Sequence, residues 1–132
     1  WLAAAERSTK AAMVAANVTP SDIDLFELHD SFTIMAALAL EAAGFAERGR
    51  GWSLANEAMI GRAGSVPIST FGGLKARGNP VGATGVYQLV EAAQQLRGQA
   101  GDCQVADAKV AMVQCLGSGG GTAVSHILRL DE

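Results

Sequence analysis

Apolar residues recur at helical spacing in three stretches of the chain, residues 2–16, 32–43 and 86–96. Each stretch is followed by a residue that commonly ends a helix: Asn17, Gly44 and Gly98. The second stretch carries Phe32 and Met35 on its apolar face. Asp30 or Ser31 precedes it, and either side chain can accept hydrogen bonds from the N–H groups of a first helical turn. The pattern therefore predicts three helices.

Three shorter apolar runs predict strands, at residues 23–28, 109–116 and 122–130. The segment GSGGGTA turns the chain between the last two runs, so we expect them to form a hairpin. Residues 45–81 show little periodicity and much Gly, Ser and Pro, and such a long loop is usually functional or poorly ordered. The order helix, strand, helix, loop, helix, strand, strand predicts an α/β fold with helices layered on a mixed sheet.

Composition narrows the class of protein. With 132 residues, of which 49% are hydrophobic and 17% charged, the chain is long enough for one globular domain. The formal net charge of -3 gives no reason to expect a nucleic-acid partner, and no run approaches the roughly 20 apolar residues of a membrane span. Two cysteines make no disulfide framework and no signal peptide opens the chain, which favours a cytoplasmic protein. The chain begins with Trp1 rather than Met, which favours a fragment of a longer protein.

Three short motifs place polar or reactive side chains at the ends of predicted elements. In HDSF, His29 follows the first strand, at a position where open α/β sheets build sites. In GGLKARGNPVGATG, Asn79 lies among five glycines, and in CLGSGGG, Cys115 ends a strand against a glycine turn. Each motif also has a purely structural interpretation: a capping turn for the histidine, a surface turn for the loop, and a small buried apolar side chain for the cysteine. Taken separately, each signal is weak, and a function requires that the imidazole, the carboxamide and the thiol meet in one hollow at the edge of the sheet.

The loop at residues 72–85 has the composition of a turn that faces a ligand. Its glycines allow positive φ angles and let another group approach the main chain closely. Pro80 makes the turn rigid and restricts Asn79 to extended conformations. Lys75 and Arg77 are either a solvated face of the loop or a contact for an anionic ligand, and their spacing does not decide between the two.

Other classes of site have little support. GSGGGT lacks the lysine of a phosphate-binding loop and comes too late in the chain to open a dinucleotide-binding unit. The two histidines and two cysteines lack the spacing of a structural zinc site, so we expect no metal. His126 alternates with Val124 and Leu128 on the last strand, which favours a core or interface residue. Cys103 lies in a turn, where a structural role is favoured over a reactive one.

The segments DIDLFELHDSF, GGLKARGNPVGATG and VQCLGSGGG, in this order, resemble the three C-terminal signatures of the thiolase family. Finding all three at fitting separations is far more specific than finding any one, and the match covers nearly the whole chain. The resemblance is strongest to sterol-carrier-protein-type and archaeal-type thiolases, whose first motif has a histidine. It implies a fold of two similar βαβαβαββ halves, with residues 1–132 forming the second. The N-terminal half, which holds the nucleophilic cysteine in the family, is then absent from this chain.

The resemblance also implies chemistry on acyl-coenzyme A thioesters, by Claisen condensation or thiolysis. His29 matches the position that helps to bind a thioester oxygen, and Cys115 matches the acid/base that exchanges a proton with an α-carbon. Gly117 is expected to lend its backbone N–H to an oxyanion hole, where one donor is typically worth about 2.7–4 kcal/mol. No cofactor is implied apart from the coenzyme A of the substrate. The substrate contacts expected in the glycine-rich loop are Gly72, Gly73, Lys75, Gly78 and Pro80.

Asn79 departs from the family pattern, which has Gly-His-Pro at this point with the histidine as the base that activates the nucleophile. An asparagine takes up no proton near neutral pH and only donates or accepts hydrogen bonds. Three interpretations are open. The site resembles a Cys-His-Asn condensing enzyme, as in third-class ketoacyl synthases and hydroxymethylglutaryl-CoA synthase, with His29 and Asn79 in two of the three roles. Alternatively, the chain belongs to a thiolase-like retro-aldolase that works with a small OB-fold partner, although those enzymes carry tyrosines at the two matching positions, or to a non-catalytic scaffold subunit.

Further expectations concern the whole protein. Thiolases resemble one another in being dimers or dimers of dimers, so we expect a homodimer or tetramer. The isolated chain is expected to be inactive, because neither cysteine stands at a strand-to-helix turn suited to an acylated nucleophile. We also expect residues 52–60, in the long loop, to line an acyl pocket.

Overall fold

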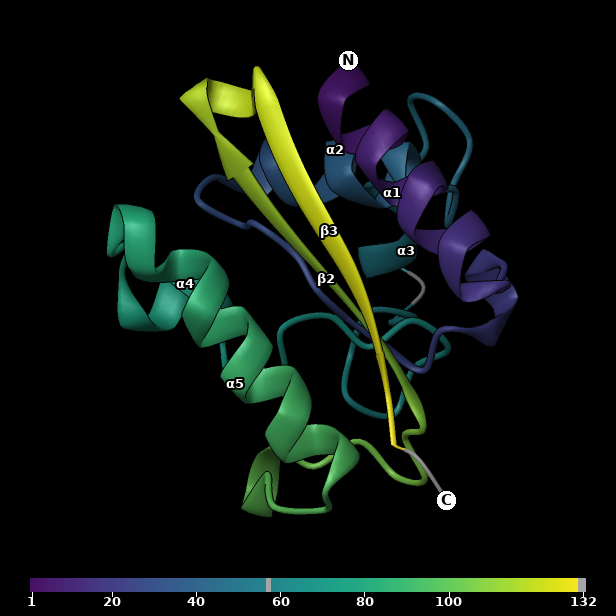
Figure 1. The fold of residues 1–132 in the computed structure, drawn as a ribbon, viewed down its shortest axis with the longest axis vertical. Coiled ribbons are helices and arrows are strands. Elements are labelled where there is room, and N and C mark those ends of the chain that lie inside the picture. Colours follow the sequence, from purple (N-terminus) through teal and green to yellow (C-terminus); the bar gives the residue numbers. More distant parts are fainter. Residues whose placement is uncertain (57, 131–132) are drawn as a thin grey trace.

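The sheet at the centre of the molecule has three strands in the computed structural model, which describes residues 1–56 and 58–130. These strands are β1 (Leu25–Glu27), β2 (Val110–Gly117) and β3 (Thr122–Arg129). β1 runs parallel to β2. β2 pairs antiparallel with β3, and Figure 1 shows these two strands side by side. The predicted mixed sheet with a terminal hairpin is therefore confirmed, although the described part of the chain has fewer strands than a complete βαβαβαββ half.

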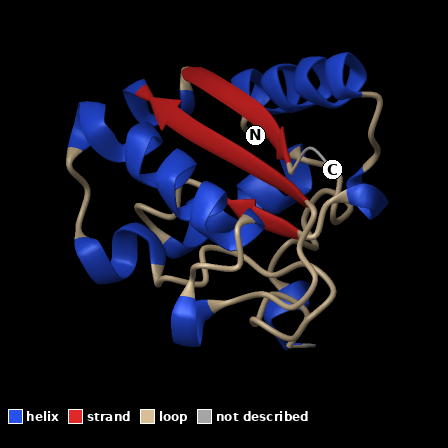
Figure 2. Ribbon diagram, turned by 60° about the horizontal axis from the view of Figure 1, so that its bottom comes forward, coloured by secondary structure: helices blue, strands red, loops and turns tan. Residues whose placement is uncertain are grey.

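Helices cover both faces of this sheet (Figure 2). The helices α1 (Ala3–Ala16) and α2 (Thr33–Ala42) pack on one face, and α5 (Thr84–Leu96) packs on the other. All three correspond to helices that the apolar spacing predicts. Asn17 ends α1 in the left-handed conformation, with φ of 53°, and its N–H donates to the carbonyl oxygen of Val14.

Side chains alternate between the two faces of the sheet along β1 and β2, so the core has two parts, one on each face. Phe26 and Met112 lie on the face covered by α2, where they pack in one cluster with Leu40. Leu25 lies on the opposite face, in a second cluster with Ala92 of α5. Phe26 and Leu25 are almost completely buried, and each contributes about 1.5–3 kcal/mol by the burial of its side chain. Because these strands are buried on both faces, they read as continuous apolar runs in the sequence.

The long segment between α2 and α5 is mostly irregular, as the sequence predicts. It contains two short helices, α3 (Ser53–Asn56) and α4 (Gly73–Arg77). Single turns of 3-10 helix occur at Pro20–Asp22, Val81–Ala83, Gly101–Cys103 and Ser118–Gly120. Nowhere in the described ranges does a helix combine the length and the apolar character that crossing a bilayer demands.

The predicted cap of α2 is wrong. Phe32 occupies the N-cap position and makes no side-chain capping bond, so neither Asp30 nor Ser31 caps this helix. The Asp30 carboxylate instead accepts hydrogen bonds from the backbone N–H groups of Leu74 and Lys75, at 2.8 and 3.4 Å. The Asp30 carboxylate therefore caps the start of α4. This helix is distant in sequence, so the pattern of residues around Asp30 does not indicate the contact.

The core interpretation of His126 is also wrong, because its side chain is exposed. His126 shares a face of β3 with Val124 and Leu128, and α5 packs only against the Leu128 end of that face. Val124 is 55% exposed. An interface role for this end of β3 therefore remains a prediction.

Candidate active site

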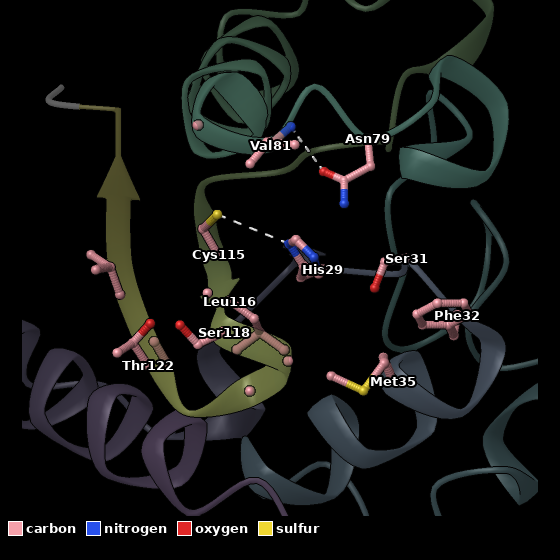
Figure 3. Close-up of a pocket in the computed structure, with 16 residues that line it drawn as sticks. His29, Ser31, Phe32, Met35, Asn79, Val81, Cys115, Leu116, Ser118 and Thr122 are labelled. Atoms are coloured by element: carbon pink, nitrogen blue, oxygen red, sulfur yellow. Dashed lines mark hydrogen bonds between the residues drawn. The ribbon is translucent and has the colours of Figure 1, made fainter.

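A hollow of about 800 Å³ opens where β1 and β2 end, and it contains all four residues expected to be catalytic. His29 comes just after β1, Cys115 and Gly117 lie near the end of β2, and Asn79 reaches in from the loop before α5. Figure 3 shows the imidazole, the thiol and the carboxamide facing one another. The expectation that these groups meet at one edge of the sheet is confirmed. Two parallel strands bring their carboxyl ends to the same edge, and the loop that leads into α5 brings Asn79 there.

His29 and Cys115 form the reactive centre of the hollow. The Sγ atom of Cys115 lies 4.0 Å from Nδ1 of His29. Burial lowers the pKa of His29, although the charge of Asp30 opposes this effect. Burial raises the pKa of the Cys115 thiol, opposed by hydrogen bonds from the backbone of Gly85 and Leu116. Both groups are therefore neutral at neutral pH. The site holds a thiol beside a neutral imidazole, which can act as a base.

Gly85 brings the first turn of α5 into direct contact with the thiol. A Cβ atom at position 85 would lie 3.3 Å from Cβ of Cys115 and 3.5 Å from its Sγ. The backbone of Gly85 also hydrogen-bonds to the sulfur. A methyl group at this position would be in tight contact with Cys115, and a larger side chain would push the start of the helix away from the thiol.

Asn79 is held so that it presents a hydrogen-bond donor. Its Oδ1 atom accepts one bond from the N–H of Val81 at 3.1 Å and another from the Thr84 hydroxyl at 2.8 Å. Since both partners donate, the oxygen is identified and the Nδ2 amine is left free. Figure 3 shows this nitrogen directed toward the hollow, on the side of His29. Asn79 therefore offers N–H donors to a ligand, and no base.

The turn that carries Asn79 stores backbone strain. Val81 has a φ of 51°, which is rare for a β-branched residue because its side chain crowds the main chain. Its N–H makes the bond to Asn79 that closes this turn. The side chain of Val81 is exposed and lines the mouth of the hollow. Strain of this kind at a ligand-facing turn is typical of functional sites.

The opposite wall is the glycine-rich turn between β2 and β3. Ser118, Gly119 and Gly120 all have positive φ values, of 50°, 61° and 96°. A Cβ atom at Gly120 would lie 2.6 Å from Cδ2 of Leu2, so the turn also packs tightly on the start of α1. This wall offers backbone groups and little side-chain bulk to a ligand.

The five residues expected to contact substrate lie outside the lining of the hollow: Gly72, Gly73, Lys75, Gly78 and Pro80. Gly73 instead lies against Asp30, where a Cβ atom would come within 2.5 Å of the carboxylate. From this loop the hollow receives Asn79, Val81 and Gly82. The described residues of the 52–60 segment do not line it either, so the expected acyl-pocket role of that segment is not supported; Glu57 lies outside the described residues.

Several lining residues escape the sequence analysis. Phe32 and Met35 fall on the apolar stripe of α2, which favours the core, yet Phe32 is 66% exposed and both residues line the hollow. Ser31 and Thr122 add hydroxyl groups. Only the position of HDSF at the end of a strand hints that the residues after His29 face a site. Among the residues that the structure describes, no group of three or more His, Cys, Asp and Glu side chains is arranged to hold a metal ion.

Comparison with known proteins gives a consistent result. Residues 1–130 match the family model described as thiolase C-terminal domain-like. Over 112 residues the chain is 48% identical to the acetyl-CoA acetyltransferase of Methanothermobacter thermautotrophicus, covering 85% of this chain and 29% of that protein. It is 44% identical over 108 residues to human sterol carrier protein 2, covering 82% of this chain and 20% of the other. The benzoylsuccinyl-CoA thiolase subunit BbsB of Thauera aromatica is 33% identical over 103 residues, which are 77% of this chain and 27% of the subunit.

A solved structure shows the same fold. It is titled Ltp2-ChsH2(DUF35) aldolase, is 26% identical in sequence, and superposes with a TM-score of 0.86 over 96% of this chain and 32% of its own. The chain thus spans less than a third of the length of each of these four proteins.

Proposed function

Because this chain belongs to the thiolase C-terminal domain-like family, we propose that its hollow takes the thioester end of an acyl-coenzyme A and assists carbon–carbon bond chemistry beside the thioester carbonyl. The observation that carries the proposal is the meeting of His29, Asn79 and Cys115 at one hollow, with the Asn79 amine free to donate. A thioester enolate needs fixed donors at its oxygen and an acid/base at its α-carbon. Asn79 supplies the first and Cys115 the second.

We assign the stabilisation of the enolate oxygen to N–H donors of the hollow. Negative charge gathers there when a bond at the α-carbon is made or broken, and a donor that is already oriented stabilises it without reorganisation. The Asn79 amide meets this condition because its oxygen is fixed by Val81 and Thr84. The backbone N–H of Gly117 is a second donor that we assign from the family resemblance. Each donor of this kind is typically worth about 2.7–4 kcal/mol.

Cys115 moves the proton. As a thiol it gives its proton to the α-carbon of an enolate, which completes bond cleavage, and the thiolate that remains takes a proton from an α-carbon in the opposite direction. His29, with Nδ1 4.0 Å away and uncharged near neutral pH, takes up the proton that the attacking thiol or the substrate hydroxyl releases when the carbon–carbon bond breaks, and passes it to the Cys115 thiolate; in the condensation direction both transfers are reversed. The pair thus balances the proton in both directions.

For acyl transfer, the nucleophile must come from outside this chain. We propose a cysteine in the remainder of the protein or in a partner subunit, with His29 and Asn79 completing a Cys-His-Asn site. The relatives extend well beyond the matched region, which supports a further domain or subunit. The acyltransferase function is supported by the sequence similarity to an acetyl-CoA acetyltransferase and to a thiolase subunit.

A second candidate is retro-aldol cleavage of a thioester without an acylated enzyme. It is favoured by Asn79, which is no base, and by the similarity to an aldolase structure. The enolate and its protonation at Cys115 are the same in both reactions. They differ in whether an acyl group is ever bonded to the protein. A third candidate, a scaffold subunit, predicts neither event.

Two measurements on the full-length protein separate these candidates. Incubation with acetyl-CoA in D₂O, followed by mass spectrometry of the thioester, detects exchange of α-protons, which both enzymatic candidates require. Intact-protein mass spectrometry after acid quenching detects an acyl-enzyme, which only acyl transfer requires. Exchange with acylation supports the transferase, exchange without acylation supports the aldolase, and the absence of both in the assembled protein refutes the proposal.

A further inference from the structure

A buried cluster of charged side chains lies beneath the turn that carries Asn79. Nη1 of Arg77, at the end of α4, donates to both carboxylate oxygens of Glu91 on α5, at 2.7 and 2.9 Å. Glu27, the last residue of β1, is completely buried beside this pair. Asp30 and the hydroxyl of Ser69 are the other polar groups that face Glu27. None of the four charged residues lines the hollow, and the chemistry above uses none of them.

This cluster needs a proton. Glu27 faces the carboxyl groups of Asp30 and Glu91, and the one guanidinium that acts on it is that of Arg77. The carboxyl groups of Glu27 and Glu91 face each other, and two ionised carboxylates repel each other in a buried site. In the ionised form, neither oxygen of Glu27 has a hydrogen-bond partner among the described residues. A neutral Glu27 resolves both conflicts, because its O–H donates to Glu91.

The electrostatics agree with this assignment. Burial, reinforced by the charge of Glu91, raises the pKa of Glu27 to about 8. Burial also raises the pKa of Glu91, but Arg77 and the hydrogen bond from Glu27 act in the opposite direction. The proton therefore belongs on Glu27 at neutral pH.

The cluster is connected to the site through α4. Asp30, which follows His29, accepts the N–H groups at the start of this short helix. Arg77 fixes its other end to α5, and Asn79 follows two residues later. The helix thus spans from the His29 segment to α5, and the Asn79 turn leaves from its anchored end.

We propose that Glu27, in its neutral form, is a positioning residue that holds the Asn79 turn in place through Glu91 and Arg77. Loss of its proton places a second negative charge beside Glu91, and both carboxylates then compete for Arg77. The end of α4 loosens, and the Asn79 amine loses its fixed direction. This inference rests on the proposed function in one respect, namely that the Asn79 amine meets the carbonyl oxygen of a thioester.

The test measures binding rather than turnover. The probe is a ketone analogue of acetyl-CoA in which a methylene group replaces the thioester sulfur, so that no acyl group is transferred. Its affinity for the full-length protein is measured by calorimetry between about pH 6 and pH 9.5, a range centred on the raised pKa of Glu27. We expect the affinity to fall about tenfold through about pH 8, as one oriented donor is lost. Glu27→Gln, which stays neutral and keeps a donor, is expected to lack this tenfold fall.

A matched control comes from another buried glutamate. Glu41 on α2 accepts the N–H of Gly51 at 2.9 Å and lies outside this cluster, so Glu41→Gln is expected to retain the wild-type profile. His29 and Cys115 titrate in every variant, so the difference between wild type and Glu27→Gln isolates Glu27. An alkaline loss in Glu27→Gln that is as large as in the wild type, or an affinity lowered equally at every pH, overturns the proposal. If Glu27→Gln does not fold, Glu91→Gln removes the carboxylate that competes with an ionised Glu27 for Arg77 and is also expected to abolish the transition.

A second measurement stays informative if the ketone analogue fails to bind, which is the failure of the proposed function. Hydrogen exchange of the backbone amides of residues 72–85, corrected for the intrinsic effect of pH, reports the order of the turn directly. We expect protection to fall above about pH 8 in the wild type and to stay level in Glu27→Gln. Equal exchange in the two proteins refutes the positioning role whatever the ligand does.

Discussion

The hydroxyl of Thr84, in the first turn of α5, donates to Oδ1 of Asn79 at 2.8 Å. Thr84 is completely buried, so the amide orientation of an exposed residue is set by a residue of the core. The proposed donor in the hollow is therefore only as well oriented as this hydroxyl and the Val81 N–H make it.

Replacing the hydroxyl tests this relationship. Thr84→Val keeps the shape of the side chain and removes the donor, which costs the Asn79 amide a hydrogen bond of about 1 kcal/mol. Affinity for the ketone analogue is expected to fall about fivefold. Thr9→Val is the control, since Thr9 is an equally buried threonine on α1 that lies outside the hollow. A similar loss of affinity in both variants would mean that general destabilisation, and not the Asn79 amide, is responsible.

Asn79→Asp removes the amine and places a negative charge where the enolate oxygen develops its own. We expect turnover to fall by about 10²-fold, the effect of losing one oriented donor. The measurement is the rate of α-proton exchange of acetyl-CoA in D₂O. If the protein is a scaffold subunit, the variant instead leaves partner binding intact and there is no rate to lose.

Cys115→Ala is expected to abolish α-proton exchange, because no other described side chain of the hollow can take its place as an acid/base beside His29. Cys103→Ala removes the other cysteine, which is outside the hollow, and is expected to exchange at the wild-type rate. Exchange that survives in Cys115→Ala assigns the proton transfer to another group and contradicts the role given to the thiol.

Gly73→Ala is expected to destabilise the protein by about 2 kcal/mol or more, because a Cβ atom would collide with the Asp30 carboxylate at a positive φ of 60°. Gly98→Ala imposes a similar φ of 67° with no atom within 4 Å, so it measures the backbone strain alone. Denaturant midpoints of the two variants give the difference. Equal midpoints would show that Asp30 moves aside without cost.

Stability is expected to depend on pH through Glu27. Its pKa is raised from 4.5 to about 8 by folding, so between these values the folded protein holds a proton that the unfolded chain has lost. The free energy of unfolding therefore falls as pH rises through this window, with a slope approaching about 1.4 kcal/mol per pH unit. Denaturation of Glu27→Gln across the same range is expected to give a flatter profile. A wild-type slope in that variant would show that other groups cause the dependence.

Much of the fold could be predicted from the sequence because its main elements have clear local patterns. The helical stripes give α1, α2 and α5, and continuous apolar runs give the strands. Left-handed residues at Asn17 and Gly44 mark helix ends that the sequence also indicates. The convergence of His29, Asn79 and Cys115 was expected from the resemblance of the three motifs to one family's signatures, and the parallel pairing of β1 with β2 brings it about.

What could not be predicted depends on contacts between distant segments. Asp30 precedes a helix and has the chemistry of a cap, but the close approach of Gly73 brings another helix start to its carboxylate. Phe32 continues the apolar stripe of α2, but apolar spacing alone does not show whether a side chain packs in the core or lines the hollow. The pairing of Arg77 with Glu91, fourteen residues apart, requires knowing that α4 folds back on α5. In each case the sequence indicates the chemistry of the side chain but not the residues that it contacts in the folded protein.

The contact between Gly85 and Cys115 constrains how related sequences are able to diverge. A methyl group at position 85 would already be in tight contact with Cβ of Cys115, and a larger side chain would need the volume that the thiol occupies. Homologues that keep the cysteine for proton transfer are therefore expected to keep glycine, or at most alanine, at position 85.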